Sequence, residues 1–169
     1  MERGRPDRDP LVPDPRTMIG HVHLKVSDLG RAEAFYRDVL GFEVTTRYGS
    51  EAVFLSFGGY HHHVALNTWY SKGAGPAPTN RAGLFHFAIL VPDRAALARA
   101  LRRLLDHGVE LDGAADHGVS EALYLHDPDG NGIEIYRDRD RSEWPTNPDG
   151  SVAMSTLPLD VPALLAEAG

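Results

Sequence analysis

The stretch His21-Val-His-Leu-Lys-Val-Ser-Asp28 decides the fold, because His86-Phe-Ala-Ile-Leu-Val-Pro-Asp93 matches it further along the chain. In both stretches a histidine stands seven residues before an aspartate (28 − 21 = 7 and 93 − 86 = 7). Polar and apolar residues alternate from His21 to Val26, which predicts a strand, and the apolar run around Ile89 fits a second one. Aspartate is a preferred cap of a following helix, and a glycine that can end that helix follows at Gly41 and at Gly108. We interpret this match as an internal repeat.

The repeat predicts an α+β fold made of two βαβββ modules, at about residues 18–69 and 83–138 of a domain spanning 18–138. The expected elements of the first module are a strand at 21–26, a helix at 29–40 and strands at 42–48, 51–57 and 60–68. Those of the second are a strand at 85–91, a helix between Asp93 and Gly108, and strands at 109–115, 119–126 and 131–137. Outside them we expect an extended or disordered arm at 1–17, a linker at 70–82 and a C-terminal extension at 139–169 with a short helix within 159–168.

Composition narrows the classes of function. The chain has 169 residues, a net charge of -7 and no basic stripe, so we expect no nucleic-acid partner. It has no apolar run long enough for a membrane span, and its first residues do not resemble a secretory signal, so we expect a cytoplasmic protein without membrane contact. There is no cysteine, which excludes thiolate metal sites, while nine histidines suggest where the chemistry lies.

Strand alternation places three ligand-type residues on the faces that point away from the helices. They are His21 in the first strand, His86 in the fifth and Glu134 in the eighth. Two imidazoles and one carboxylate on one side of a metal leave open positions, an arrangement suited to Fe(II). Taken singly, a strand histidine is ordinarily structural or exposed, and the matched repeat positions are what favour a site. The residues expected to pack against the helices are Val22, Leu24, Val26, Phe85, Phe87, Ile89, Val91, Leu123, Leu125, Ile133 and Ile135.

Three segments carry a resemblance to a known family. They are His21–Asp28, Ala34-Phe-Tyr-Arg-Asp-Val-Leu-Gly-Phe42 and Asp127-Pro-Asp-Gly-Asn-Gly-Ile-Glu-Ile-Tyr136. They look like the vicinal-oxygen-chelate superfamily of glyoxalases, extradiol dioxygenases and bleomycin-binding proteins, and the likeness covers about residues 18–138. The resemblance implies a cup-shaped mixed sheet around a divalent metal held by His21, His86 and Glu134.

Within that superfamily the extradiol dioxygenases, and the catechol 2,3-dioxygenase-like proteins in particular, resemble this chain best. The resemblance implies cleavage of a catechol-like aromatic by O2. It also implies His62 as acid-base residue, with His117 and Tyr124 as hydrogen-bond donors to the oxygens. Alternation alone leaves open whether His62 or its neighbours His61 and His63 face the site. Classical enzymes of this type have two such domains, and this chain has one.

Further residues complete the expected site. His23, Asn67 and Trp69 are expected substrate contacts, although Asn67 is equally suited to orient a neighbour or cap a loop. Trp69 and Phe85 could line a ring-sized pocket, with core packing the favoured role for Phe85.

Three questions stay open at this point. The metal is expected to be Fe(II), but the same ligands suit Mn, Ni, Co or Zn. A glyoxalase-like isomerase or lyase, with His62 as a fourth ligand, is the first alternative to a dioxygenase. A non-catalytic small-molecule binding protein of the bleomycin-binding type is the second. We also expect a homodimer, because exposed sheet edges favour pairing.

Overall fold

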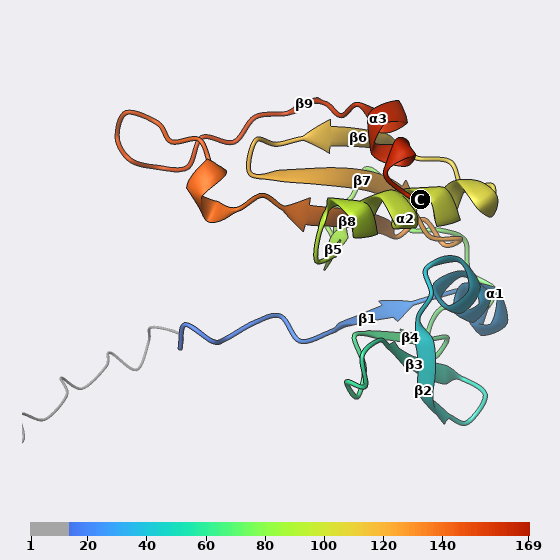
Figure 1. The fold of residues 1–169 in the computed structure, drawn as a ribbon. Helices are drawn as coiled ribbons and strands as arrows, with labels where there is room; N and C mark the ends of the chain where they lie inside the picture. The colour runs from blue at the N-terminus through green and yellow to red at the C-terminus, as the bar shows by residue number, and fades with distance from the viewer. Residues whose placement is uncertain (1–13) are drawn as a thin grey trace, which may run out of the picture.

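Two mixed sheets, each with one main helix, form the body of the protein in a computed structural model that describes residues 14–169 (Figure 1). Residues 1–13, most of the predicted N-terminal arm, lie outside the described residues. The first half contains β1 (Val22–Lys25), α1 (Leu29–Ala34), the π-helical turn η1 (Phe35–Val39), β2 (Glu43–Tyr48), β3 (Ala52–Ser56) and β4 (Val64–Asn67). The second contains β5 (Phe87–Leu90), α2 (Arg94–Asp106), β6 (Gly113–Asp116), β7 (Ser120–His126) and β8 (Gly132–Asp138). The 3-10 turn η2 (Arg141–Glu143), β9 (Leu157–Pro158) and α3 (Val161–Ala166) follow.

The strand order confirms the predicted α+β fold. The first sheet runs β1-β4-β3-β2, and the second runs β5-β8-β7-β6 with β9 added at its edge. In each sheet the first strand pairs in parallel with the fourth, and the remaining pairs are antiparallel. Because the same order and directions recur, the two halves are structural copies of one βαβββ unit.

The helix boundaries follow the signals seen in the sequence. The Asp28 carboxylate accepts a hydrogen bond from the Arg31 amide at 2.9 Å, and the Asp93 carboxylate accepts one from the Ala96 amide at 2.7 Å. These bonds satisfy amides that have no partner within the first turn of a helix. Gly41 follows the first helical segment with φ 84°, a left-handed conformation that a residue with a Cβ rarely adopts.

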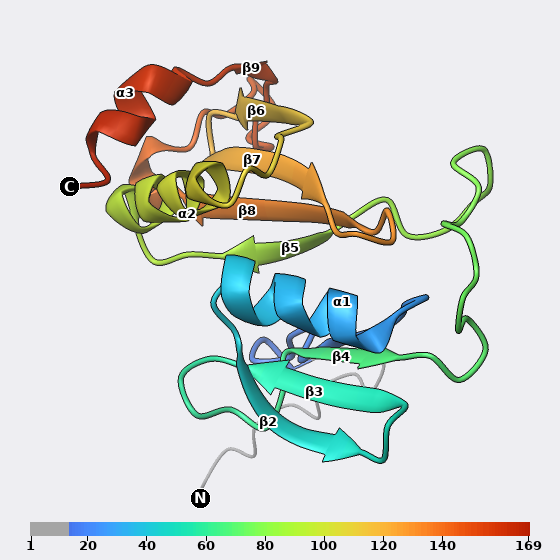
Figure 2. The same ribbon diagram turned by 90° about the vertical axis from the view of Figure 1, so that its right-hand side faces the viewer.

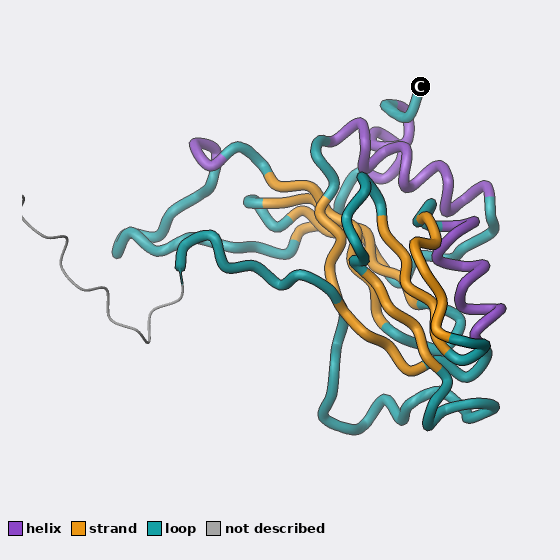
Figure 3. Tube along the Cα trace, turned by 90° about the horizontal axis from the view of Figure 1, so that it is seen from below, coloured by secondary structure: helices purple, strands orange, loops and turns teal. Residues whose placement is uncertain are grey.

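Both main helices lie on the same side of the two sheets, and the sheets lie edge to edge with β1 and β5 as the facing edges (Figures 1 and 2). Seen from below, the strands form a curved layer with the helices along one side (Figure 3). Alternate strand residues are buried beneath the helices and form the core with the inner faces of the helices. The core includes Leu24, Val26, Val64, Leu66, Phe87, Leu123, Leu125, Ile133 and Ile135, with Leu97 and Leu101 of α2 packed against them. Phe85 is an exception to our prediction. It precedes β5 and is 86% exposed, so it does not pack in the core.

Polar contacts join the two halves at the turn between β7 and β8. The Tyr36 hydroxyl donates to the Asp127 carboxylate at 3.0 Å, and both residues are buried. The Ser27 hydroxyl and the Arg31 guanidinium donate to Asp129 at 2.5 and 2.8 Å. Burial, and then the nearby Asp127 charge, raises the pKa of Tyr36 well above its ordinary value, so its phenol keeps the proton that makes this bond.

The predicted strand at 60–68 is too long at its start. Residues 60–63 form an irregular loop with bends, and β4 begins only at Val64. Gly58 and Gly59 have φ values of 63° and 79°, which interrupt extended backbone just before this segment. The Thr45 hydroxyl then donates to the His61 carbonyl at 2.8 Å and holds the loop. Strand alternation therefore says nothing about which way His62 points.

Candidate functional site

The strand faces opposite the helices carry the polar side chains of interest. In the second sheet the register aligns four residues in one row, namely Ala88 on β5, Glu134 on β8, Tyr124 on β7 and Gly113 on β6. The residues at the two ends of the row are small. Glu134 and Tyr124 therefore stand side by side, with no large side chain of this row on either flank.

His86 and Glu134, two of the three predicted metal ligands, lie next to each other. The His86 Nε2 atom lies 3.0 Å from the Glu134 Oε2 atom. Two ligands each about 2.1 Å from an ion and at right angles to one another are about 3.0 Å apart, so the pair has the spacing of neighbouring ligands. The donor set, imidazole and carboxylate, also suits Fe, Mn or Zn.

A chain of polar contacts continues from Glu134 toward the surface. The Tyr124 hydroxyl donates to Glu134 Oε1 at 3.2 Å and lies 2.7 Å from His117 Nε2. Burial, with the neighbouring Glu134 charge, raises the pKa of Tyr124 to about 12. Tyr124 is thus a neutral phenol with one proton and two neighbouring acceptors.

A second group of side chains lies in the first half of the chain. The rings of His21 and His62 are 4.4 Å apart, and His62 Nδ1 lies 2.7 Å from His61 Nδ1. The Phe54 ring contacts the edge of His62 at 5.1 Å between centroids. Burial is the largest cause of a lowered His62 pKa, and the neighbouring His21 and His61 lower it further.

The three expected substrate contacts belong to this second group, in the first half of the chain. The Asn67 side chain lies 2.9 Å from His23 Nε2, and the Trp69 ring packs edge-on against His23 at 5.5 Å. Asn67 Oδ1 also accepts from the Trp69 amide at 3.2 Å. The Asn67 side chain thus contacts a neighbouring ring and also caps the loop after β4, so both roles considered from the sequence stay open.

The structure thus divides the predicted site residues between two clusters. We call them the His86 cluster (His86, Glu134, Tyr124 and His117) and the His21 cluster (His21, His23, His61, His62, Asn67 and Trp69). Within residues 14–169, no three histidine, aspartate or glutamate side chains are gathered closely enough to hold an ion. His21 as the third ligand beside His86 and Glu134 stays a prediction, and so does the role of His62.

A cavity of about 570 Å³ adjoins the His86 cluster. His86 and Tyr124 line it, and the linker residues 77–79 and 81–84 with Phe85 form another part of its wall. Asp112 and His126 also line it, with His126 Nδ1 2.5 Å from Asp112 Oδ2. Sequence reasoning missed this role of the linker and of Asp112, because neither follows from strand periodicity. The exposed Phe85 is accounted for as part of this wall.

Gly132 is a further residue that sequence reasoning missed. It pairs with His126 across β8 and β7, and it lines the cavity. A Cβ atom at this position would lie 2.2 Å from the Phe85 carbonyl oxygen and 3.1 Å from His86 Cβ. Only glycine lets the backbone that carries His86 come this close to β8.

Comparison with known proteins identifies the family. Residues 18–135 match the family model described as the Glyoxalase/Bleomycin resistance protein/Dioxygenase superfamily. The chain belongs to this superfamily. This confirms the resemblance drawn from the three sequence segments and accounts for the repeated βαβββ unit.

Dioxygenases stand out among the similar proteins. The chain is 44% identical to the catechol-2,3-dioxygenase of Bacillus subtilis (strain 168) over 154 residues, which are 90% of this chain and 53% of the relative. It is 34% identical to biphenyl-2,3-diol 1,2-dioxygenase 3 of Rhodococcus globerulus, over 71% of this chain and 63% of that protein. The chain therefore spans between half and two thirds of the length of these relatives. A lactoylglutathione lyase of Salmonella typhimurium is 26% identical over 71% of this chain and 92% of its own.

Solved structures share the fold. The crystal structure of a lactoylglutathione lyase from Agrobacterium tumefaciens matches with a TM-score of 0.58 at 25% identity, over 73% of this chain and 96% of that chain. A glyoxylase/bleomycin resistance protein/dioxygenase domain from Frankia sp. EAN1pec matches with a TM-score of 0.64 at 21% identity, over 74% and 94%. No helix within residues 14–169 is both long and apolar enough to cross a bilayer.

Proposed function

We propose that the chain is a metal-dependent extradiol dioxygenase that cleaves a catechol-like aromatic ring with O2. The observation that carries the proposal is the His86 cluster. It combines a ligand-spaced imidazole and carboxylate with a phenol and a second imidazole, beside a cavity that accommodates an aromatic ring. The likeness to two dioxygenases supports this choice within the superfamily.

His86 and Glu134 would hold the metal, with His21 as the third protein ligand. A divalent ion there, Fe(II) by our proposal, would supply Lewis acidity and bring the two catechol oxygens and O2 together. Manganese is a realistic substitute, since a manganese-dependent 2,3-dihydroxybiphenyl 1,2-dioxygenase is among the relatives, at 26% identity. Because the described residues do not gather three ligands, a shift of the His21 cluster toward β5 is part of the proposal.

The remaining residues would act on protons and orientation. Tyr124 would turn its single phenol proton away from Glu134 and His117 and donate it to a substrate or oxygen atom. His62 beside His21 would accept a proton from a catechol hydroxyl. Phe85 and the linker would shield the ring from water, while His23, Asn67 and Trp69 would contact its other side.

Anaerobic loading with Fe(II), followed by a panel of catechols and then oxygen, tests the activity. We expect a coloured ring-opened product from the wild-type chain, and less than about a hundredth of that rate from His86→Ala and Glu134→Gln. His107→Ala is the matched control, because the His107 imidazole caps the end of α2 by its bond to the Arg103 carbonyl and belongs to neither cluster. Metal-loaded wild-type protein that cleaves no catechol would refute the proposal.

A glyoxalase-like isomerase or lyase is the second candidate. The contact between His21 and His62 favours it, because two adjacent imidazoles can both bind one ion. The likeness to a lactoylglutathione lyase supports it as well. X-ray absorption spectroscopy of the metal-loaded chain distinguishes the two, since four protein ligands including His62 favour the isomerase and three favour the dioxygenase.

A homodimer is the proposed assembly. All residues of β2 except one are exposed, so this sheet edge is free to pair within the part of the chain that is described. Light scattering at micromolar concentration should give twice the chain mass of 18.5 kDa. A monomer mass would contradict this assembly without affecting the proposed chemistry.

A further inference from the structure

The turn that carries His117 is clamped by the C-terminal extension, which lies beyond the residues that match the family model. β9 pairs with β6, with Leu157 opposite Asp116 and Pro158 opposite Ala115. The Ser155 amide then donates to the His117 carbonyl at 3.1 Å. The extension is therefore in direct contact with the backbone of His117.

Ser155 also contacts the imidazole ring of His117. His117 Nδ1 lies 2.7 Å from the Ser155 carbonyl oxygen, and a carbonyl can only accept a hydrogen bond. Nδ1 must therefore carry the ring hydrogen. In the neutral ring this leaves the lone pair on Nε2, which lies 2.7 Å from the Tyr124 hydroxyl.

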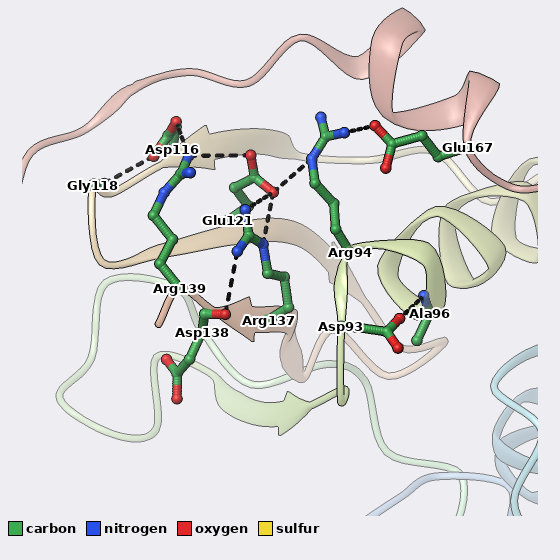
Figure 4. Close-up of polar contacts among 10 residues, drawn as sticks. All are labelled: Asp93, Arg94, Ala96, Asp116, Gly118, Glu121, Arg137, Asp138, Arg139 and Glu167. Atoms are coloured by element: carbon green, nitrogen blue, oxygen red, sulfur yellow. Dashed lines mark hydrogen bonds and ion pairs between the residues drawn. The ribbon is translucent and has the colours of Figure 1, made fainter. Parts of the chain in front are cut away.

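Other contacts hold this turn in place (Figure 4). The Asp116 carboxylate accepts from the Gly118 amide at 2.8 Å and from the Arg139 guanidinium at 2.6 Å. Gly118 has φ 75°, and a Cβ there would lie 3.1 Å from Pro145 Cγ in the extension. The extension thus contacts the turn on both sides of His117, with Leu157 opposite Asp116 and Pro145 beside Gly118.

The far end of the extension is anchored as well. Leu164 of α3 is fully buried, and Glu167 forms an ion pair with Arg94 at the start of α2 (Figure 4). Arg94 in turn pairs with the buried Glu121 at 2.9 Å. The segment around Ser155 is thus held at both ends, and its carbonyl has a defined position.

We propose that the Ser155 backbone carbonyl is a positioning group that fixes the Nδ1–H tautomer of His117 and so leaves Nε2 as an acceptor that competes with Glu134 for the single proton of Tyr124. This makes the C-terminal extension part of the working site. The catalytic consequence rests on the proposed function, whereas the tautomer itself does not.

The first test is the tautomer in the metal-free full chain, measured by ¹⁵N NMR with two-bond correlations to the ring carbon-bound protons above neutral pH. We expect a protonated-type nitrogen shift at Nδ1 and an unprotonated-type shift at Nε2 of His117. The opposite tautomer, or an average of both, overturns the proposal. No metal or substrate is needed, so the result is independent of whether the chain is a dioxygenase.

The second test weakens the clamp. Ser155→Pro keeps the carbonyl but removes the amide that ties residue 155 to the His117 carbonyl, so the acceptor of Nδ1 loses its fixed position and we expect a mixture of tautomers. Thr156→Ala is the control, because the Thr156 hydroxyl is the other group near Nδ1, at 3.5 Å. An unchanged tautomer in folded Ser155→Pro, or the same mixture in Thr156→Ala, overturns the proposal.

The third test separates the two ring nitrogens. Asparagine places its amide where Nδ1 lies, and glutamine reaches the position of Nε2. If wild-type protein is active, we expect His117→Gln to keep more activity than His117→Asn, and Ser155→Pro to lower kcat about 10- to 100-fold with little change in KM. Wild-type kcat in Ser155→Pro refutes the positioning role, while an inactive wild type refutes the proposed function instead.

Discussion

Replacing Gly132 with alanine tests whether the position of His86 depends on the close approach of the Gly132 and Phe85 backbones. The added Cβ would lie 2.2 Å from the Phe85 carbonyl oxygen, whereas carbon and carbonyl oxygen ordinarily come no closer than about 3.3 Å. The backbone before β5 would therefore have to retreat by about 1 Å. His86 would move with it, because its own Cβ lies 3.1 Å from the added methyl.

Two quantities should change together. Forcing a methyl group into packed backbone costs about 1–3 kcal/mol of folding free energy. A 1 Å shift of His86 disturbs its 3.0 Å spacing from Glu134, and loss of ligand orientation typically lowers metal affinity about 10- to 100-fold. That range corresponds to about 1.4–2.8 kcal/mol of binding free energy.

The assay is a competition titration of Fe(II) or Mn(II) against a chromophoric chelator, with urea unfolding measured on the same samples. Gly113→Ala is the matched control, since Gly113 lines the same cavity and a Cβ there meets no atom within 4 Å. We expect weaker metal binding from Gly132→Ala and near wild-type binding from Gly113→Ala. Equal metal affinity and stability in Gly132→Ala and wild type would refute the steric reasoning.

Three further predictions concern stability. Tyr36→Phe removes the buried bond to Asp127 and should lower the free energy of unfolding in urea by about 1–3 kcal/mol; no loss would mean that this bond does not help join the halves. Leu101→Ala empties a fully buried position under α2 and should cost about 2–5 kcal/mol in the same measurement, whereas a cost below that range would mean that the core collapses to refill it. The Arg47 guanidinium holds the pKa of Glu33 below its ordinary value of 4.5. The ionised Glu33 therefore stabilises the fold above pH 4.5, and this stabilisation is lost as the pH falls through the lowered pKa. Glu33→Gln should flatten the dependence of unfolding free energy on pH below 4.5, and an unchanged slope in that range would contradict this.

The fold could be predicted from the sequence because its signals are local. Asp28 and Asp93 act as caps within three residues of themselves, and the glycine after each helix acts on its own backbone. The matched spacing of His21 and His86 then revealed two copies of one unit. The strand predicted at 60–63 was wrong because the backbone at Gly58 and Gly59 has positive φ, and the loop after them continues until β4 begins at Val64.

The site could be predicted only in part, for a related reason. Alternation put Tyr124 and Glu134 on one face, and the register of β7 with β8 places them opposite each other. No residue pairing joins β1 to β5 among the described strands, so periodicity could not give the distance from His21 to His86. The Ser155 contact with His117 was equally inaccessible, because 38 residues separate the two in the chain.

The turn between β7 and β8 connects the contacts between the two halves to Glu134, a predicted metal ligand. Asp127 accepts from the Asp129 and Asn131 amides at 2.9 Å each, and the Tyr36 hydroxyl reaches the same carboxylate. Glu134 follows only three residues after Asn131, on the strand that this turn begins. These bonds, together with the shared hydrophobic core, hold α1 against the start of β8. Because α1 follows β1 directly, they also act on the strand next to His21, so a weakened turn should loosen the proposed metal binding as well as the fold.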